Sequence, residues 1–178
     1  MALLIFFLEG ILLLNTPIAI AFSAKVILTS AIRVEQPLNI VGDSEQLYRL
    51  VSNLIINAIQ YTPQFGKVTV VLDRSENNAV IQVQDTGIGI PHQELTRIFD
   101  RFYRVNSDAY GGLRLRSRKT GGSGLGLAIA QAIIQSHQGS LNVQSQLGKG
   151  STFTIQLPLD VTPISQFKLL YRRQPKFQ

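Results

Sequence analysis

A glycine-rich loop that runs directly into an apolar, helix-forming segment is the feature of this sequence that most restricts its fold. Gly122, Gly124 and Gly126 stand at alternate positions, and an apolar run extends from Leu125 to Ile134. Glycine allows backbone N–H groups to approach a ligand closely, and the N-terminus of a helix carries partial positive charge. Together these properties suit a bound anion such as phosphate. The loop alone also fits an ordinary turn before a helix, so its meaning depends on the motifs that accompany it.

The composition excludes several kinds of chemistry. The 178 residues contain no cysteine, which rules out disulfides and thiolate metal sites, and the two histidines, His92 and His137, are too few for a histidine-rich metal centre. The net charge is +6, and eleven of the 17 lysines and arginines form two clusters: Arg97, Arg101, Arg104, Arg114, Arg116, Arg118 and Lys119, and near the end Lys168, Arg172, Arg173 and Lys176. Such clusters attract nucleotide phosphates, nucleic acid or anionic lipid, and a solvated basic surface explains the second cluster equally well.

Residues 1–24 are mostly apolar, and they leave two interpretations open. Their length is about the 20 residues that a membrane-spanning helix needs, but Glu9, Asn15 and Pro17 interrupt the run, and no lysine or arginine precedes it as in a signal peptide. The segment is either a membrane helix or anchor, or a helix or remnant that packs on the domain. We therefore expect three parts: the apolar segment 1–24, a domain over 25–159, and a basic tail over 160–178. The domain is expected to be cytoplasmic, with membrane association through residues 1–24 as the open alternative.

Hydrophobic periodicity predicts an α+β domain with a mixed or antiparallel sheet and helices on one face. The predicted helices run from a cap at Asp43 or Ser44 to Tyr61, from Glu94 to Phe102 and from Leu125 to Ser136. The predicted strands are Lys25–Val34, Leu38–Val41, a hairpin of Lys67–Asp73 and Ala79–Gln84, and a second pair of Ser140–Ser145 and Ser151–Leu157. No periodicity runs through Asn106–Ser123, which is expected to be a loop.

Two asparagines on the first predicted helix are candidates for ligand contact. Asn53 and Asn57 are four residues apart, so they share one helix face next to the apolar stripe, and Gln60 and Tyr61 follow them. A bare amide there would be costly unless it were paired. An asparagine oxygen is a hard ligand that suits Mg²⁺, whereas an internal hydrogen-bonded pair would explain the same two residues structurally.

Asp85 ends an apolar strand and enters a turn with Gly87 and Gly89. Its carboxylate could accept from the amino group of a base, coordinate a metal or cap the turn. Asp-Thr-Gly after a strand is also typical of retroviral-type aspartic proteases, which would bring two Asp85 carboxylates together across a dimer and raise one pKa. That alternative leaves Asn53, Asn57 and the glycine loop without a role. The glycine spacing fits neither a Walker A loop nor a dinucleotide-binding fingerprint.

Five motifs in order resemble one known family. They are Asn53–Ala58, Asp85–Pro91, Ile98–Arg104, Gly122–Leu127 and Gly148–Phe153. These resemble the N box, first glycine box, F box, second glycine box and third glycine box of the ATP-binding domain of sensor histidine kinases. The wider superfamily also contains gyrase B, the heat-shock chaperone ATPases and MutL. The similarity extends from about Leu38 to Leu159, and Phe99 and Phe102 favour the kinase branch.

The resemblance implies a two-layer α/β sandwich of the Bergerat type that binds ATP and Mg²⁺. By position, Asn57 would hold Mg²⁺, Asn53 would support the phosphates or the metal, and Arg104 would contact the γ-phosphate, so these three are the implied catalytic residues. Asp85 would accept from the adenine amino group, and Phe99 and Phe102 would anchor the hinge of a lid. The implied nucleotide-binding residues are Asn57, Gln60, Tyr61, Asp85, Gly87, Gly89, Ile90, Lys119, Gly122, Gly124, Leu125, Gly126, Leu127 and Ser151.

The sequence departs from the family pattern at three places. Gln60 stands where many members carry a lysine, and the loop Ser107–Arg118 is longer than usual. No phospho-accepting histidine is found in its expected context, because His92 follows Pro91 within the nucleotide region and His137 ends a helix and is interpreted as structural.

The expected function is therefore that of a truncated catalytic domain, which transfers the γ-phosphate of ATP to a histidine on another domain or chain. The implied partners are ATP, a histidine-bearing dimerisation domain in trans and a response regulator, without nucleic acid. The alternative is a catalytically incomplete nucleotide-binding fragment or adaptor with the same fold.

Overall fold

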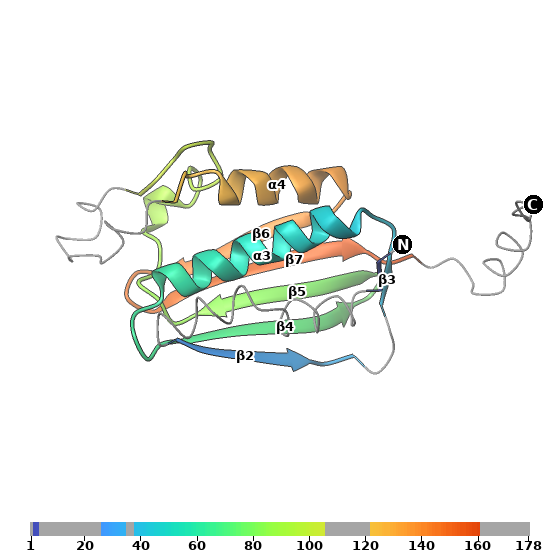
Figure 1. The fold of residues 1–178 in the computed structure, drawn as a ribbon, viewed down its shortest axis with the longest axis horizontal. Coiled ribbons are helices and arrows are strands. Elements are labelled where there is room, and N and C mark those ends of the chain that lie inside the picture. Colours follow the sequence, from blue (N-terminus) through green and yellow to red (C-terminus); the bar gives the residue numbers. More distant parts are fainter. Residues whose placement is uncertain (1, 4–25, 35–37, 106–121, 161–178) are drawn as a thin grey trace, which may run out of the picture.

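The computed structural model describes residues 2–3, 26–34, 38–105 and 122–160. Two helices lie over one face of a five-stranded sheet, so the domain has two layers (Figure 1). The elements in chain order are β1 (Ala2–Leu3), β2 (Ile27–Ile32), β3 (Asn39–Ile40), α3 (Ser44–Tyr61), β4 (Lys67–Ser75), β5 (Asn78–Asp85), the 3₁₀-helix η1 (His92–Glu94), α4 (Gly126–Ser136), β6 (Ser140–Gln146) and β7 (Gly150–Pro158).

The main sheet is mixed, which is one of the two sheet types that the sequence predicts. Its strand order is β2-β4-β5-β7-β6, with β2 parallel to β4 and every other neighbouring pair antiparallel. The predicted hairpin of β4 and β5 is confirmed, with Ser75 opposite Asn78 at its turn. The predicted strand Leu38–Val41 is shorter than expected and lies outside this sheet, because β3 pairs antiparallel with β1.

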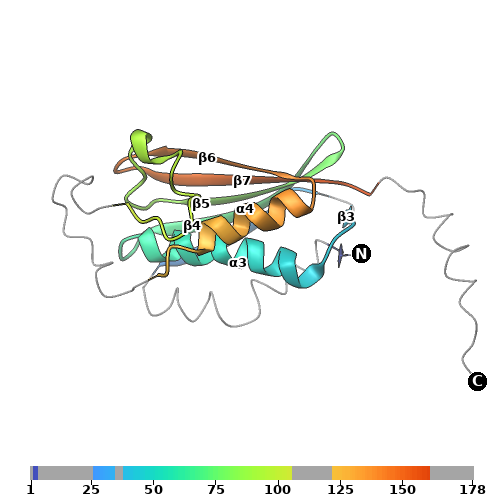
Figure 2. The same ribbon diagram turned by 90° about the horizontal axis from the view of Figure 1, so that it is seen from above.

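The core fills the space between the helices and the sheet. Alternate residues of β4 and β5, such as Val70 and Ile81, face α3 and are almost fully buried, as the period of two in a half-covered strand requires. The buried stripe of α3 consists of Leu47, Leu50, Val51, Leu54, Ile55, Ala58 and Ile59. Burial of each large aliphatic side chain contributes about 1.5–3 kcal/mol. The helices lie side by side over the sheet, α3 against β4 and β5 and α4 against β6 (Figures 1 and 2).

The start of α3 confirms the predicted cap. Asp43 has extended backbone angles, and its Oδ1 accepts from the backbone N–H of Glu45 at 2.9 Å and of Gln46 at 3.1 Å. The hydrogen bond from the N–H of Gln46 has the largest effect on the pKa of Asp43. Together the two bonds stabilise the ionised carboxylate and lower this pKa. The cap satisfies two of the N–H groups that a helix leaves without an internal partner.

The predicted helix Glu94–Phe102 is wrong. Only His92–Glu94 forms a short 3₁₀-helix, and the chain then continues in turns to Phe102. The hydrogen bonds Arg97 N–H to Glu94 O and Asp100 N–H to Arg97 O span three residues, so apolar side chains recur at nearly helical spacing without an α-helix. The backbone of Phe102 then takes a positive φ of 64°, which ends any right-handed continuation.

Several predictions lie outside the described residues. They concern the apolar segment 1–24 apart from Ala2 and Leu3, the loop Ser107–Arg118, Lys119, and nearly all of the tail 160–178. The boundaries 1–24, 25–159 and 160–178 accordingly stay predictions. In the part of the chain that the structure describes, no helix combines the length and the hydropathy needed to cross a membrane.

Candidate functional site

Asp85 is a buried carboxylate at the end of the central strand β5, with 6 % of its surface exposed. Its Oδ1 accepts from the backbone N–H of Gly87 at 2.8 Å and of Ser151 at 3.2 Å. Burial raises the pKa of Asp85, and these two hydrogen bonds oppose the rise. Among the described residues no hydrogen bond reaches Oδ2, so this oxygen is available to accept from a ligand.

The loop after Asp85 is pressed against the end of α3. A Cβ on Gly87 would lie 2.5 Å from the carbonyl oxygen of Tyr61 and 2.6 Å from Asp85 Oδ1, so no side chain fits there. The same carbonyl of Tyr61 accepts from the N–H of Ile88 at 3.2 Å. Tyr61 thus holds this loop through its backbone, while its side chain is 37 % exposed.

The β6–β7 hairpin forms hydrogen bonds with the same loop. The N–H of Gly148 donates to the carbonyl of Ile88 at 2.7 Å, and the N–H of Ile90 donates to Ser145 Oγ at 2.7 Å. Gly89, with φ of 69°, passes so close to the carbonyl of Gln146 that a Cβ would overlap it. The loop is therefore fixed between α3 and the hairpin.

The two asparagines predicted as ligand residues face the start of α4. Asn53 Nδ2 donates to the carbonyl of Gly126 at 3.2 Å. A Cβ on Gly126 would lie 3.7 Å from Asn57 Nδ2 and 4.0 Å from Asn57 Oδ1. Asn53 links α3 to α4 and does not form the hydrogen bond between the two amides that was the structural alternative. Within the described part of the chain its amide oxygen accepts no hydrogen bond, so it can accept from a ligand.

The glycine loop continues along the polar face of α3. A Cβ on Gly122 would lie 3.9 Å from the amide of Gln60, one turn beyond Asn57. Leu125 occupies the cap position of α4 and provides no side-chain hydrogen bond to the helix. The first N–H groups of α4, which include that of Leu127, therefore point into this region without a side-chain cap, which suits an anion.

The structure says less about the other residues that the sequence predicts for the site. Phe99 packs against the core, whereas Phe102 is 71 % exposed and takes part through its backbone, which donates to Gly124 O at 2.9 Å. Arg104 is exposed and lies two residues before the segment 106–121, which is outside the described ranges. Lys119 belongs to that segment. The phosphate roles predicted for Arg104 and Lys119 therefore stay predictions.

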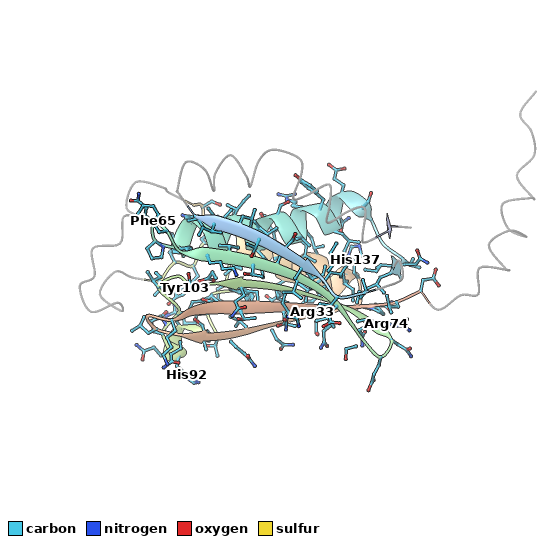
Figure 3. All side chains as sticks on the ribbon, turned by 90° about the horizontal axis from the view of Figure 1, so that it is seen from below. Arg33, Phe65, Arg74, His92, Tyr103 and His137 are labelled. Carbon is cyan, nitrogen blue, oxygen red and sulfur yellow. The ribbon has the colours of Figure 1, made fainter. Side chains whose placement is uncertain are left out.

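The two histidines lie at opposite ends of the molecule (Figure 3). His92 is exposed on η1, while His137 follows the last residue of α4. His137 Nε2 accepts from the backbone N–H of Asp43 at 3.1 Å, and its Nδ1 lies 2.8 Å from the carbonyl of Ile133. His137 thus joins the end of α4 to the start of α3, which is a structural role.

Two depressions on the described surface do not include Asn57 or Gly126 in their lining. One, of about 280 Å³, is lined by Gln84, Asp85, Gln144, Ser145, Gln146, Lys149, Gly150, Ser151 and Thr152. The other, of about 640 Å³, is at the far end around Gly42 and His137. The first includes Asp85, and it also includes the register pair Gln84 and Thr152, which alternate with buried core positions such as Val83 and Phe153. In the described ranges no three His, Cys, Asp or Glu side chains come together as a metal centre.

Ser145 was not predicted as a site residue. It was placed only at the end of a strand, and its hydrogen bond with Ile90 joins positions 55 residues apart. Nothing in the local pattern of β6 distinguishes it from Ser140, the other serine of that strand.

Comparison with known proteins agrees with this geometry. Residues 42–161 match the family described as histidine kinase-, DNA gyrase B-, and HSP90-like ATPase. The sensor histidine kinase RppB of Synechocystis sp. is 61 % identical over 123 residues, which are 69 % of this chain and 26 % of that protein. The sensor histidine kinase WalK of Bacillus subtilis is 42 % identical over 118 residues, which are 65 % of this chain and 18 % of that protein.

Solved structures give the same fold. The mycobacterial sensor histidine kinase MprB superposes with a TM-score of 0.70 at 27 % identity, covering 89 % of this chain and 95 % of that one. The catalytic domain of the histidine kinase ThkA superposes with a TM-score of 0.71 at 21 % identity, covering 88 % and 93 %, and supports the fold alone. The chain spans about a quarter or less of the two curated relatives named above. It belongs to the family of histidine kinase-, DNA gyrase B- and HSP90-like ATPases, and its relatives there are sensor histidine kinases.

Proposed function

We propose that this chain is the Mg·ATP-binding catalytic domain of a sensor histidine kinase, which transfers the γ-phosphate of ATP to a histidine on another domain or chain. The observation that carries the proposal is the buried Asp85, whose Oδ1 is held by two backbone N–H groups. A carboxylate fixed in this way presents Oδ2 to the amino group of adenine. Gly87, Gly89 and Ile90 form the loop beneath the base, and Ser151 lies beside the carboxylate.

The phosphates of ATP would lie between α3 and the start of α4. Gly122 and Gly126 bring the backbone close to the polar face of α3, Gly124 between them packs against Phe102, and the N-terminus of α4, which has no side-chain cap, adds partial positive charge. Gln60 lies beside Gly122 at one end of this path, and Asn53 lies beside Gly126 at the other. Arg104 and Lys119 are the proposed basic contacts to the γ-phosphate.

The donor set fits Mg²⁺ when phosphate oxygens complete it. Asn57 provides a hard amide oxygen close to Gly126, where the phosphates would lie, and Mg²⁺ takes few protein ligands when it is bound with phosphates and water. Bound there, Mg²⁺ would neutralise charge that develops on the phosphates during transfer. Phosphoryl transfer requires mainly positioning and charge stabilisation, and Asn53, Asn57 and the glycine loop supply positioning.

The proposed partners follow from the chemistry of transfer. The acceptor is a histidine on a dimerisation domain, in the same protein or in trans, and a response regulator would take the phosphoryl group onward. The similar structure of full-length ShkA was solved in complex with AMPPNP, an ATP analogue; it superposes with a TM-score of 0.69 at 25 % identity, covering 86 % of this chain and 29 % of that one.

Titration calorimetry with AMPPNP tests the proposal. Binding is expected to strengthen with Mg²⁺ and to weaken about tenfold or more in Asp85→Asn, because a hydrogen bond to a charged acceptor contributes roughly 1.5–3 kcal/mol. Asp73→Asn is the matched control, since Asp73 lies at the other end of the β4–β5 hairpin and is opposite Val80. Binding that is independent of Mg²⁺ and equal in both variants would refute the proposal. Incubation with labelled ATP and a separate histidine-bearing hairpin then distinguishes a kinase from a nucleotide-binding adaptor.

A further inference from the structure

The hydroxyl of Ser145 lies where the loop beneath the proposed base meets the β6–β7 hairpin. Three groups surround its Oγ: the N–H of Ile90 at 2.7 Å, the carbonyl of Gly150 at 3.0 Å and the hydroxyl of Ser151 at 3.0 Å. Ser145 is half-buried on β6, directly opposite Ser151 on β7. Its side chain therefore joins three separate parts of the site.

The chemistry of these groups determines where the protons lie. A hydroxyl has one proton to donate and two lone pairs that accept. The carbonyl of Gly150 can only accept, so it takes the proton of Ser145, while the N–H of Ile90 can only donate. When all three contacts are satisfied at once, the hydroxyl of Ser151 donates its proton to Ser145.

The proton arrangement makes Ser151 an acceptor toward any other group. Its only hydroxyl proton is directed to Ser145, and its backbone N–H is directed to Asp85 Oδ1. Asp85, as a carboxylate, also offers only acceptors. The two neighbouring side chains thus present hydrogen-bond acceptors and no donor.

We propose that Ser145 is a specificity-determining residue of the nucleotide site, which acts by keeping the hydroxyl proton of Ser151 away from the base. A purine with a 6-amino group donates to such acceptors, whereas a 6-oxo purine places another acceptor against them. The inference rests on the proposed function, which places the base against Asp85. Ser145 is a positioning residue, because it acts through Ser151 and through the loop at Ile90.

Ser145 has a second effect that can be separated from the first. Its contact with Ile90 fixes the loop that follows Asp85, so its loss weakens the binding of every purine nucleotide to a similar extent. Without Ser145, the hydroxyl proton of Ser151 can turn toward the base, which changes only the ratio of the dissociation constants of 6-amino and 6-oxo nucleotides. The ratio is therefore the quantity that reports specificity, and the absolute affinity reports positioning.

The test compares the dissociation constants of ATP and ITP, with Mg²⁺, in the full chain. ITP replaces the 6-amino group by an oxygen and leaves the sugar and phosphates unchanged. Ser145→Ala is expected to lower the preference for ATP over ITP roughly three- to tenfold, the range expected for one hydrogen bond. Ser145→Thr, which keeps the hydroxyl, is expected to restore the preference. Ser140→Ala removes a hydroxyl that bonds Gln156 Oε1 at 3.3 Å at the other end of β6, and it should leave the preference unchanged.

Ser151→Ala provides a second variant in case Ser145→Ala does not fold. It removes the acceptor itself and must also lower the preference for ATP. An unchanged ratio in Ser145→Ala or in Ser151→Ala, or an equal fall in Ser140→Ala, would overturn the inference while ATP binding persists. If the unmodified chain binds ATP no better than a non-nucleotide anion such as pyrophosphate, the proposed function fails and the inference fails with it.

Discussion

The backbone N–H of Phe102 donates a 2.9 Å hydrogen bond to the carbonyl oxygen of Gly124. This bond ties together the two ends of the segment that contains the predicted lid. Both residues have positive φ, 64° for Phe102 and 70° for Gly124. Phe102 of the F box thus holds the glycine loop at Gly124 through a main-chain hydrogen bond.

Gly124→Ala is expected to break this link. A Cβ at Gly124 would lie 2.8 Å from the carbonyl carbon of Phe102 and 2.9 Å from Tyr103 O, and a non-glycine residue in left-handed conformation costs about 1–2 kcal/mol by itself. We expect a fall of at least that size in the free energy of unfolding by urea, and weaker ATP binding. The matched control is Gly122→Ala, whose Cβ meets nothing closer than 3.9 Å and which should unfold within about 0.5 kcal/mol of the unmodified chain. Equal stability of the two variants would contradict this account of the link.

Asp85→Asn is expected to change how stability depends on pH. Burial raises the pKa of Asp85 in the folded chain above its unfolded value, so the folded state binds the proton more tightly. The stability that Asp85 contributes is then greatest when it is protonated, and it falls as pH rises from the unfolded pKa through the folded one. Relative to Asp85→Asn, the unmodified chain should become more stable on acidification through that window, as measured by urea unfolding. A relative loss of stability on acidification would contradict the raised pKa.

The two asparagines of α3 should respond differently to removal. Asn53 Nδ2 bonds the carbonyl of Gly126, so Asn53→Ala should reduce the free energy of unfolding by about 0.5–1.5 kcal/mol and also weaken nucleotide binding. Asn57→Ala should leave stability nearly unchanged and remove most of the Mg²⁺-dependent part of the ATP affinity. Calorimetry with and without Mg²⁺, together with urea unfolding of both variants, separates the two roles. An Mg²⁺ dependence that survives in Asn57→Ala would remove Asn57 as the metal ligand.

Removal of the cap at Asp43 should lower the stability of the domain, although Asp43 lies at the end of α3 opposite to Gln60 and Tyr61. Asp43→Ala loses two hydrogen bonds to α3, whereas Asp43→Asn can retain them, because asparagine caps helices about as well. The pKa of Asp43 is lowered in the folded state, so its ionic contribution is present above the unfolded pKa and disappears as pH falls through the folded pKa. Thermal unfolding should therefore rank the unmodified chain and Asp43→Asn above Asp43→Ala at neutral pH, with the first two converging in acid. If Asp43→Ala melted at the same temperature as the unmodified chain, the cap would not be needed for stability.

Much of the fold could be predicted because it depends on local patterns. Helix α3 begins directly after its cap Asp43 and ends at Tyr61, as predicted, since a capping carboxylate and a long apolar stripe both act locally. The β4–β5 hairpin likewise follows from alternation on both sides of a short polar turn. The predicted helix Glu94–Phe102 failed because turns and an α-helix place apolar side chains at similar spacing, and the contact of Phe102 with Gly124 that selects the turns is distant in sequence.

The candidate site could be predicted only in part. Resemblance to a family indicated Asp85, Gly87 and Ser151, and the structure brings these three into hydrogen-bond contact. Ser145 could not be identified, because its role depends on the way β6 is aligned with β7 and with the loop at Ile90. A half-buried serine near the end of a strand has no local feature that distinguishes such a position.

The most direct test of the central claim is to observe which backbone amides respond to nucleotide. Two-dimensional ¹H–¹⁵N spectra of the chain, titrated with AMPPNP and Mg²⁺, should show the largest shifts at Gly87, beside Asp85, and at Gly126, beside Asn57. Pyrophosphate alone should shift the amide of Gly126 and leave that of Gly87 nearly unchanged, since it lacks a base. Shifts that avoid both glycines, or that are the same for AMPPNP and pyrophosphate, would contradict a nucleotide bound between α3 and α4 with its base at Asp85.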